Sequence, residues 1–214
     1  SENRAGIVRY RAADQTFREF LHNGPALSSG STPRADTRQE VGLPVDAGPW
    51  RFVPFVAGRG TVWGESPYDG GLARGFGIAG IRGSMYLTRI YPDVRSPMFD
   101  VDGVRHIIKP TITAWTSETS HDKDELFPFD ETVEKIAGTD GAALGVRQRW
   151  QTERGAGDNR RVVDVFTHDL ELGVFNDAES DETTNGYTSS TRPENSISHN
   201  YVNSSTIWRI NDRT

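Results

Sequence analysis

Four basic residues occupy polar positions in three segments of the sequence in which apolar and polar residues alternate. If those segments are neighbouring strands of one sheet, side chains at every second position share a face, so the cations would line one wall. Arginine and lysine gathered in this way bind phosphate and carboxylate oxygens, so the pattern predicts a basic stripe for an anionic ligand. In the simpler alternative, the cations pair with carboxylates such as Glu40. The four residues are Arg82, Lys109, Arg147 and Arg149.

Arg105 and His106 form a second candidate, at the start of a long alternating segment. The arginine fork could bind a lipid phosphate, with the imidazole beside it. The simpler interpretation is that the two residues anchor the start of a strand at a membrane interface.

An acidic stretch at 118–141 is the third region rich in chemical groups. Residues 121–125 offer carboxylate oxygens of the kind that divalent cations prefer, but they lack the glycine-centred spacing of a calcium loop. We therefore expect a solvated acidic loop, with no metal site and no cofactor. No Gly-x-Ser-x-Gly motif is present, and the adjacent Asp130 and Glu131 would point apart on a strand. An enzyme is not expected.

Composition narrows the class of protein further. The 214 residues carry 24 basic and 30 acidic side chains, for a net charge of −6, and 35% of them are apolar. No basic run is long enough to neutralise several phosphates of a nucleic acid. Cysteine is absent, which excludes disulfides and thiolate metal sites. No apolar run reaches the roughly 18 residues of a membrane-spanning helix, whereas a low apolar fraction is normal for a barrel with a wet interior.

Apolar and polar residues alternate along most of the chain. Within 105–117, Ile108, Ile112 and Ala114 fall on even positions, and polar residues fall on most odd ones. A period of two indicates extended strands with two unlike faces. The runs exceed the usual length of about five or six residues and reach the roughly nine to eleven that cross a bilayer. The sequence predicts an all-β fold, an antiparallel meander of long strands that is an unclosed part of a large transmembrane β-barrel.

About six or seven strands are expected in a partial barrel wall over residues 34–214, after a loop or strand end in residues 1–33. Short turns and long loops alternate between them, as at the two rims of outer-membrane barrels. The sequence begins without methionine or a signal peptide and ends within an apparent strand, so we expect a fragment. The expected strands are 34–45, 50–65, 75–91, 105–117, 142–153, 161–175 and 197–210, with a possible short strand at 7–10.

The alternation also assigns each strand position to a face. Trp50 and Trp63 would mark the two rims of the apolar band, provided that a bulge in 58–60 puts both rings on one side. Predicted inward positions are Arg38, Glu40, Arg82, Lys109, Arg147 and Arg149. Predicted lipid-facing positions are Val41, Leu43, Ile81, Met85, Leu87, Ile108, Ile112, Leu144 and Val146.

Several segments, taken in order, resemble the barrel domain of the LptD family of lipopolysaccharide-assembly proteins, also called organic solvent tolerance proteins. They are residues 37–44, 54–59, 103–110, 129–131 and 144–150. The most specific element is an Arg-His pair followed by an apolar pair and a proline, and then by an acidic loop with Phe-Asp-Glu. The family-motif positions are Arg105, His106, Pro110, Phe129, Asp130 and Glu131.

This resemblance implies a barrel in the bacterial outer membrane that places lipopolysaccharide in the outer leaflet. It also implies two kinds of partner, an outer-membrane lipoprotein that plugs the barrel and a periplasmic transport bridge. Two other functions remain open from the sequence. One is a general porin-like barrel, and the other is a secreted soluble β-sandwich that binds glycans, whose strands should be shorter.

Overall fold

A single antiparallel sheet of ten strands makes up most of the computed structural model. Its order is β1-β2-β4-β5-β7-β8-β9-β10, with β3 beside β4 and β6 beside β7. The predicted all-β, antiparallel meander is confirmed, and the sheet does not close into a barrel. The structure describes residues 1–9, 31–66, 70–122, 125–126, 130, 132–134, 136–155, 159–176, 192–195 and 199–210.

The described residues form ten strands instead of the expected six or seven, because two of the expected strands are split and the possible short strand at 7–10 is part of a longer strand, β1. Residues 34–45 fall in β2 and β3, residues 75–91 fall in β5 and β6, and β1 lies within the segment 1–33. The strands are β1 (Glu2–Arg9), β2 (Ser31–Gly42), β3 (Val45–Ala47), β4 (Trp50–Trp63), β5 (Leu72–Met85), β6 (Leu87–Ser96), β7 (Val101–Thr119), β8 (Gly141–Arg154), β9 (Arg161–Phe175) and β10 (Tyr201–Trp208).

The break between β5 and β6 lies opposite a proline. β5 pairs with β7 as far as Ser84 and Thr111, and β6 resumes at Leu87 and Ile108. Pro110 lies between these two pairs on β7 and has no N–H to donate to a neighbouring strand. This family-motif position therefore divides one long strand into two.

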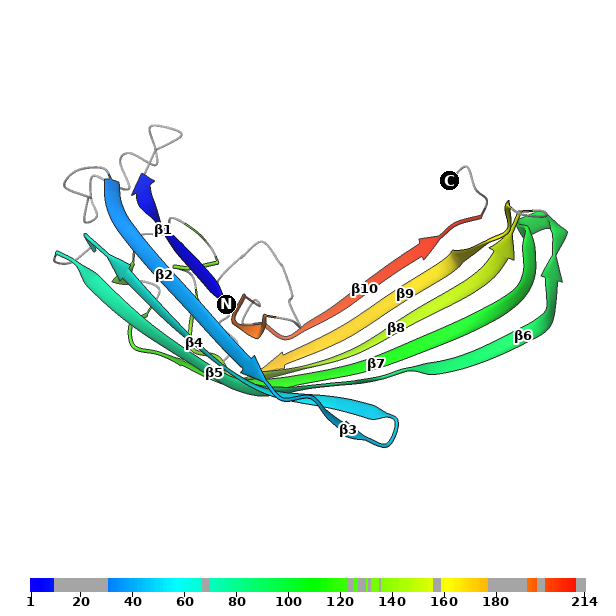
Figure 1. Ribbon diagram of the computed structural model, residues 1–214, viewed down its shortest axis with the longest axis horizontal. Helices are drawn as coiled ribbons and strands as arrows, with labels where there is room; N and C mark the ends of the chain where they lie inside the picture. The colour runs from blue at the N-terminus through cyan, green and yellow to red at the C-terminus, as the bar shows by residue number, and fades with distance from the viewer. Residues whose placement is uncertain are drawn as a thin grey trace.

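The sheet is bent into an open trough (Figure 1). Strands β1, β2, β4 and β5 form one arm, and β6 to β10 form the other. The turn η4 (Pro193–Asn195) lies on the concave side, where its Glu194 pairs with Arg38 of β2. We call the face that carries Arg38 the inner face and the opposite one the outer face.

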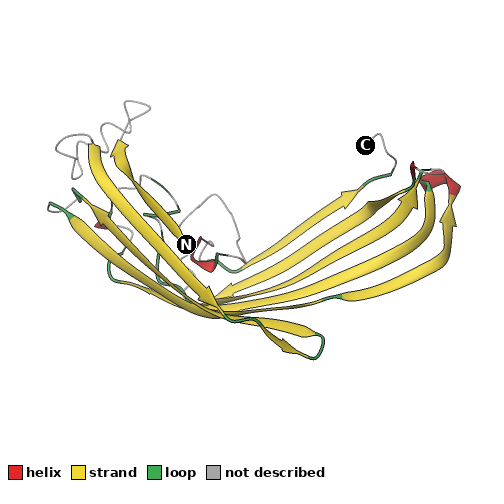
Figure 2. Cartoon of the chain, viewed as in Figure 1, coloured by secondary structure: helices red, strands yellow, loops and turns green. Residues whose placement is uncertain are grey.

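Strands account for most of the described chain (Figure 2). The helical elements with assigned bounds are the three-residue turns η1 (Pro97–Phe99) and η4. Among the described residues, none belongs to a helix with the length and hydropathy needed to cross a membrane.

A row of alternating aromatic residues and glycines runs across the inner face. Each residue of the row pairs with the next one from β4 to β9, in the order Phe55, Gly80, Trp115, Gly141 and Phe175. A Cβ atom at Gly80 would lie 2.7 Å from the ring of Phe55, and one at Gly141 would lie 2.6 Å from the ring of Trp115. The rings thus cover their glycine neighbours, an arrangement that permits strong sheet curvature.

We expect Gly141→Ala to lower the free energy of unfolding by about 1–3 kcal/mol, because the new methyl group overlaps the Trp115 ring. Gly77→Ala is the matched control, since nothing lies within 4 Å of a Cβ atom at Gly77. The control should be neutral or stabilising by about 0.4–1 kcal/mol. Urea unfolding in detergent, followed by tryptophan fluorescence, measures both, and equal destabilisation would contradict the packing assigned to this row.

Candidate functional site

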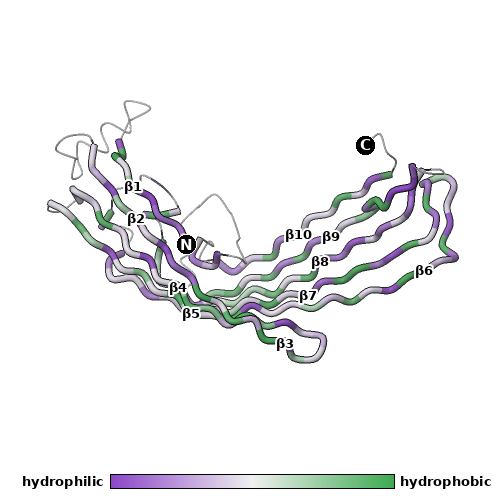
Figure 3. The backbone as a smooth tube through the Cα atoms, in the orientation of Figure 1, coloured by the Kyte–Doolittle hydropathy of each residue, from purple (hydrophilic) through white to green (hydrophobic). Residues whose placement is uncertain are grey.

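The two faces of the sheet differ sharply in chemistry. The register places Val56 and Ile81 on the outer face, where they are 58% and 38% exposed, and Leu144 there is 51% exposed. Arg38 and Arg59 pair across β2 and β4 on the inner face. Hydrophobic and hydrophilic residues alternate along the strands (Figure 3). The register agrees with the face predicted for every strand residue named above except Trp63.

Trp63 does not lie on the outer face as the rim prediction requires. The pairing from Trp50 to Trp63 runs without a register shift, so the expected bulge is absent from β4. An odd separation then puts the two rings on opposite faces. Trp63 is buried on the inner face, where its indole Nε1–H donates to Glu134 Oε1 at 2.9 Å.

A different set of rings forms an aromatic row on the outer face. The row contains one ring from each of the strands β7 to β10, and each ring pairs with the next. The four residues are, in order, His106, Trp150, Phe166 and Trp208. The rings of His106 and Trp150 stack with centroids 4.1 Å apart, and Trp150 meets Phe166 edge-on at 4.9 Å. Such rows flank the apolar band of membrane barrels.

Arg105 and His106 do not form one site. They are adjacent on β7, so their side chains leave opposite faces. The guanidinium Nε of Arg105 donates to Gln151 Oε1 at 2.9 Å on the inner face. His106 stacks in the outer aromatic row. The two side chains therefore do not converge on a common position for a phosphate.

On the inner face, a set of side chains holds residues 130, 132–134 and 136 against β2, β4 and β5. We call these side chains the loop clasp. Its members are Arg34, Arg59, Trp63, Arg74 and Glu134.

Glu134 is the centre of the loop clasp. Its side chain is 1% exposed. One carboxylate oxygen accepts hydrogen bonds from Arg34 Nη1 at 2.8 Å and from Trp63 at 2.9 Å, and the other accepts from the backbone N–H of Asp130 at 2.8 Å. The buried charge is therefore paired with a cation and well supplied with hydrogen bonds, as buried charges require.

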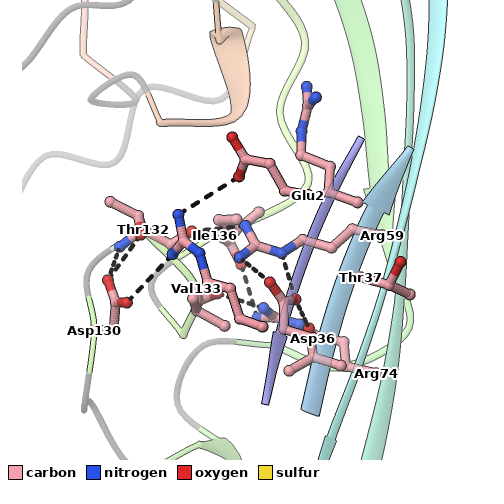
Figure 4. Close-up of polar contacts among 12 residues, drawn as sticks. Glu2, Asp36, Thr37, Arg59, Arg74, Asp130, Thr132, Val133 and Ile136 are labelled. Atoms are coloured by element: carbon pink, nitrogen blue, oxygen red, sulfur yellow. Dashed lines mark hydrogen bonds and ion pairs between the residues drawn. The ribbon is translucent and has the colours of Figure 1, made fainter. Parts of the chain in front are cut away.

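Two further arginines of the loop clasp bind the backbone of the same segment (Figure 4). Buried Arg74 donates to the carbonyl oxygens of Val133, Glu134 and Ile136. Arg59 donates to the Thr132 carbonyl at 2.6 Å. Arg59 is itself positioned by two hydrogen bonds to the Asp36 carboxylate, at 2.7 and 2.8 Å.

Apolar packing supports these polar contacts. Ile136, 1% exposed, packs with the rings of Phe55, Phe76 and Trp115. Val133 is fully buried with Trp63 in a second cluster. The segment is therefore an integral part of the inner surface rather than the purely solvated acidic loop that the sequence suggests.

Asp130 is the one member of the Phe-Asp-Glu motif whose placement is described; Phe129 and Glu131 lie outside the described residues. Burial raises the pKa of its carboxyl, but two hydrogen bonds from Thr132, at 2.8 and 2.9 Å, and the nearby Arg34 and Arg4 bring that pKa below the ordinary value. A lowered pKa stabilises the fold above the ordinary aspartate value of about 3.9, and that stability is lost as the pH falls through the folded-state pKa. Asp130 therefore stays ionised at neutral pH.

Within the stretch 121–125, the described residues show one polar contact between side chains. His121 Nδ1 lies 2.8 Å from Glu125 Oε2, and this hydrogen bond lowers the pKa of Glu125. No group of three or more His, Asp or Glu side chains with a metal-binding arrangement occurs in the part of the chain that the structure describes.

The predicted basic stripe is divided into two parts. Arg82 lies over the ring of Phe55, 3.6 Å from its centroid, and donates to Glu40 Oε1 at 2.7 Å. Glu40 also accepts from Arg38 at 2.8 Å. Arg82 therefore follows the alternative in which a carboxylate on the same face, Glu40, pairs with the cation.

The other three stripe residues lie together in a cavity of about 360 Å³, which we call the basic hollow. Arg147 donates to Asp169 at 2.7 Å, and Arg149 donates to Asp164 at 3.2 Å. The ammonium group of Lys109 lies 5.2 Å from the centroid of the Tyr86 ring. The basic hollow is lined by Tyr86, Thr88, Arg105, Ile107, Lys109, Arg147 and Arg149.

Comparison with known proteins identifies no relative. No family, no curated protein and no solved structure matches this chain.

Proposed function

We propose that this chain is part of the wall of a bacterial outer-membrane β-barrel that places lipopolysaccharide in the outer leaflet. The observation that carries the proposal is the division of one sheet into two faces. The outer face exposes aliphatic side chains beside an aromatic row, and the inner face is charged and holds a folded-in segment. In water, a sheet face with this much exposed apolar surface drives association. In the hydrocarbon core of a membrane the same face is stable, as it is on the outside of membrane barrels.

Lipopolysaccharide as the cargo rests on two kinds of support. The first is the sequence resemblance carried by segments such as 103–110 and 144–150. The second is the basic hollow on the inner face, because lipopolysaccharide carries phosphates and acidic sugars that cations attract. By the same resemblance, a lipoprotein plug would contact the inner face and a periplasmic bridge would supply the lipid.

A porin-like barrel is the second candidate. It is favoured by the loop clasp, because a segment held against the inner wall narrows a lumen in the way a channel constriction does. The soluble sandwich does not fit, since the described strands form one sheet and not two packed layers.

Depletion of the full-length protein from its own bacterium separates the two barrels. We expect newly made lipopolysaccharide to stop reaching the surface, measured by its accessibility to an impermeant label. Sensitivity to large hydrophobic antibiotics should rise in parallel. Normal surface delivery, with slower uptake of small hydrophilic solutes, would instead establish the porin-like function.

A further inference from the structure

The basic hollow has more positive charge than its protein partners neutralise. Two of its four cations pair with carboxylates, Arg147 with Asp169 and Arg149 with Asp164. The partner of Arg105 is the neutral amide of Gln151. Lys109 contacts the Tyr86 ring and has no carboxylate within ion-pair distance among the described residues.

The geometry of the arginines leaves donors available to a ligand. Arg147 binds Asp169 through Nε, and its two Nη nitrogens make no hydrogen bond to any described residue. Arg149 uses Nε and Nη2 for Asp164, which leaves Nη1. The two carboxylates therefore orient both guanidinium groups, and each guanidinium group keeps N–H groups that can donate to a ligand. Tyr86 and Thr88 line the same cavity.

We propose that the basic hollow binds a phosphoryl group carrying two negative charges. Two uncompensated cations, Lys109 and Arg105, match that charge, and the arginine fork suits the oxygen spacing of phosphate. Lys109 contributes a compact point charge, while Arg147 and Arg149 add oriented N–H groups. Arg82 takes no part, because it is bound to Glu40 on another part of the inner face.

The phosphoryl group could be part of a phosphorylated glycolipid headgroup or could be free phosphate. The headgroup alternative rests on the proposed function, because that function brings such a lipid into the lumen. The phosphoryl site itself does not depend on the proposed function.

Equilibrium binding of radiolabelled inorganic phosphate to the purified full-length protein in uncharged detergent micelles, at low and at moderate salt, tests the site. We expect saturable phosphate binding. Lys109→Gln should weaken the affinity about tenfold, because the loss of one hydrogen bond to a charged group changes a dissociation constant by about that factor. The double variant Lys109→Gln, Arg105→Gln should bind no phosphate.

Arg89→Gln is the matched control. Arg89 is paired with His106 and therefore leaves the opposite, outer face of the sheet near the same strand positions. Arg89→Gln removes the same positive charge as Lys109→Gln. Unchanged phosphate binding in Arg89→Gln therefore shows that binding depends on the basic hollow and not on the total charge of the protein. Equal weakening by Arg89→Gln, native binding by Lys109→Gln, or no saturable binding to the native chain would overturn the proposal. An unchanged β-sheet circular dichroism spectrum shows that each variant is folded.

Competition identifies the source of the phosphoryl group. Mixed micelles containing a phosphorylated diglucosamine lipid should displace the labelled phosphate, and micelles with the dephosphorylated lipid should not. Displacement by phosphorylated micelles supports a headgroup site, and binding of free phosphate without displacement supports a site for soluble phosphate. None of these measurements depends on lipid delivery in cells, so failure of the proposed function and failure of the hollow can be told apart.

Discussion

Val202→Arg is expected to impair assembly of the full-length protein in the outer membrane, and Asn203→Arg is expected to be tolerated. Val202 lies on the outer face of β10, in a row that continues through Leu172, Leu144 and Ile112. An arginine on the lipid face near the bilayer midplane costs about 2–4 kcal/mol. Asn203 is the next residue, and its side chain leaves the inner face.

These two substitutions form a matched pair. Both residues are exposed and both lie on the same strand, so the added side chain and charge are the same. In a soluble protein, two exposed changes of this kind would each shift stability by less than about 0.5 kcal/mol. Heat-modifiable migration in gels and the amount of folded protein in outer-membrane fractions measure the outcome. Equal behaviour of the two variants would show that the outer face does not contact lipid.

Alternation was sufficient to predict most of the strands. The expected strand 161–175 coincides with β9, and the period of two alone assigned the inner and outer positions predicted on β2, β5, β7 and β8. It could not assign the faces of β9, where a register shift opposite Trp150 and Gln151 places Phe166 on the outer face and Asp164 on the inner face. Local pattern could not reveal the break at Tyr86, because it depends on Pro110 in the neighbouring strand. It also could not place Trp63, whose face is fixed by an uninterrupted register with β2 and β5.

The inner site was only partly predictable for a similar reason. Lys109, Arg147 and Arg149 meet because they lie at neighbouring positions of consecutive strands, which a meander places side by side. Arg82 joins Glu40 instead, since its long side chain passes over Phe55 to a carboxylate of β2. The loop clasp unites residues 60 to 100 positions apart. The available sequence signal was the set of polar residues at inward positions of β4 and β5, namely Arg59, Thr61 and Arg74.

The second large effect is expected from Glu134→Ala, which removes the centre of the loop clasp. Arg34 would lose its hydrogen-bonded partner at 2.8 Å and keep only the longer ion pair with Asp130 at 3.6 Å, and the indole N–H of Trp63 and the backbone N–H of Asp130 would lose their acceptor. Breaking a buried, hydrogen-bonded ion pair by removing one partner destabilises by about 3–5 kcal/mol. We expect much of this loss as local opening of residues 130–140, with a smaller effect on the sheet.

Limited proteolysis and amide hydrogen exchange distinguish local opening from global unfolding. In Glu134→Ala, protection should fall at Val133 and Ile136, while the strand pair β8 and β9 stays protected. Asp140→Ala is the matched control, because it removes an exposed carboxylate from the same loop that makes no side-chain contact with the described residues. Glu134→Gln keeps the acceptor for Trp63 but loses the charge that faces Arg34, so its effect should be intermediate. If Glu134→Ala leaves protection unchanged, packing of Val133 and Ile136 alone would be sufficient to hold the segment inside the trough.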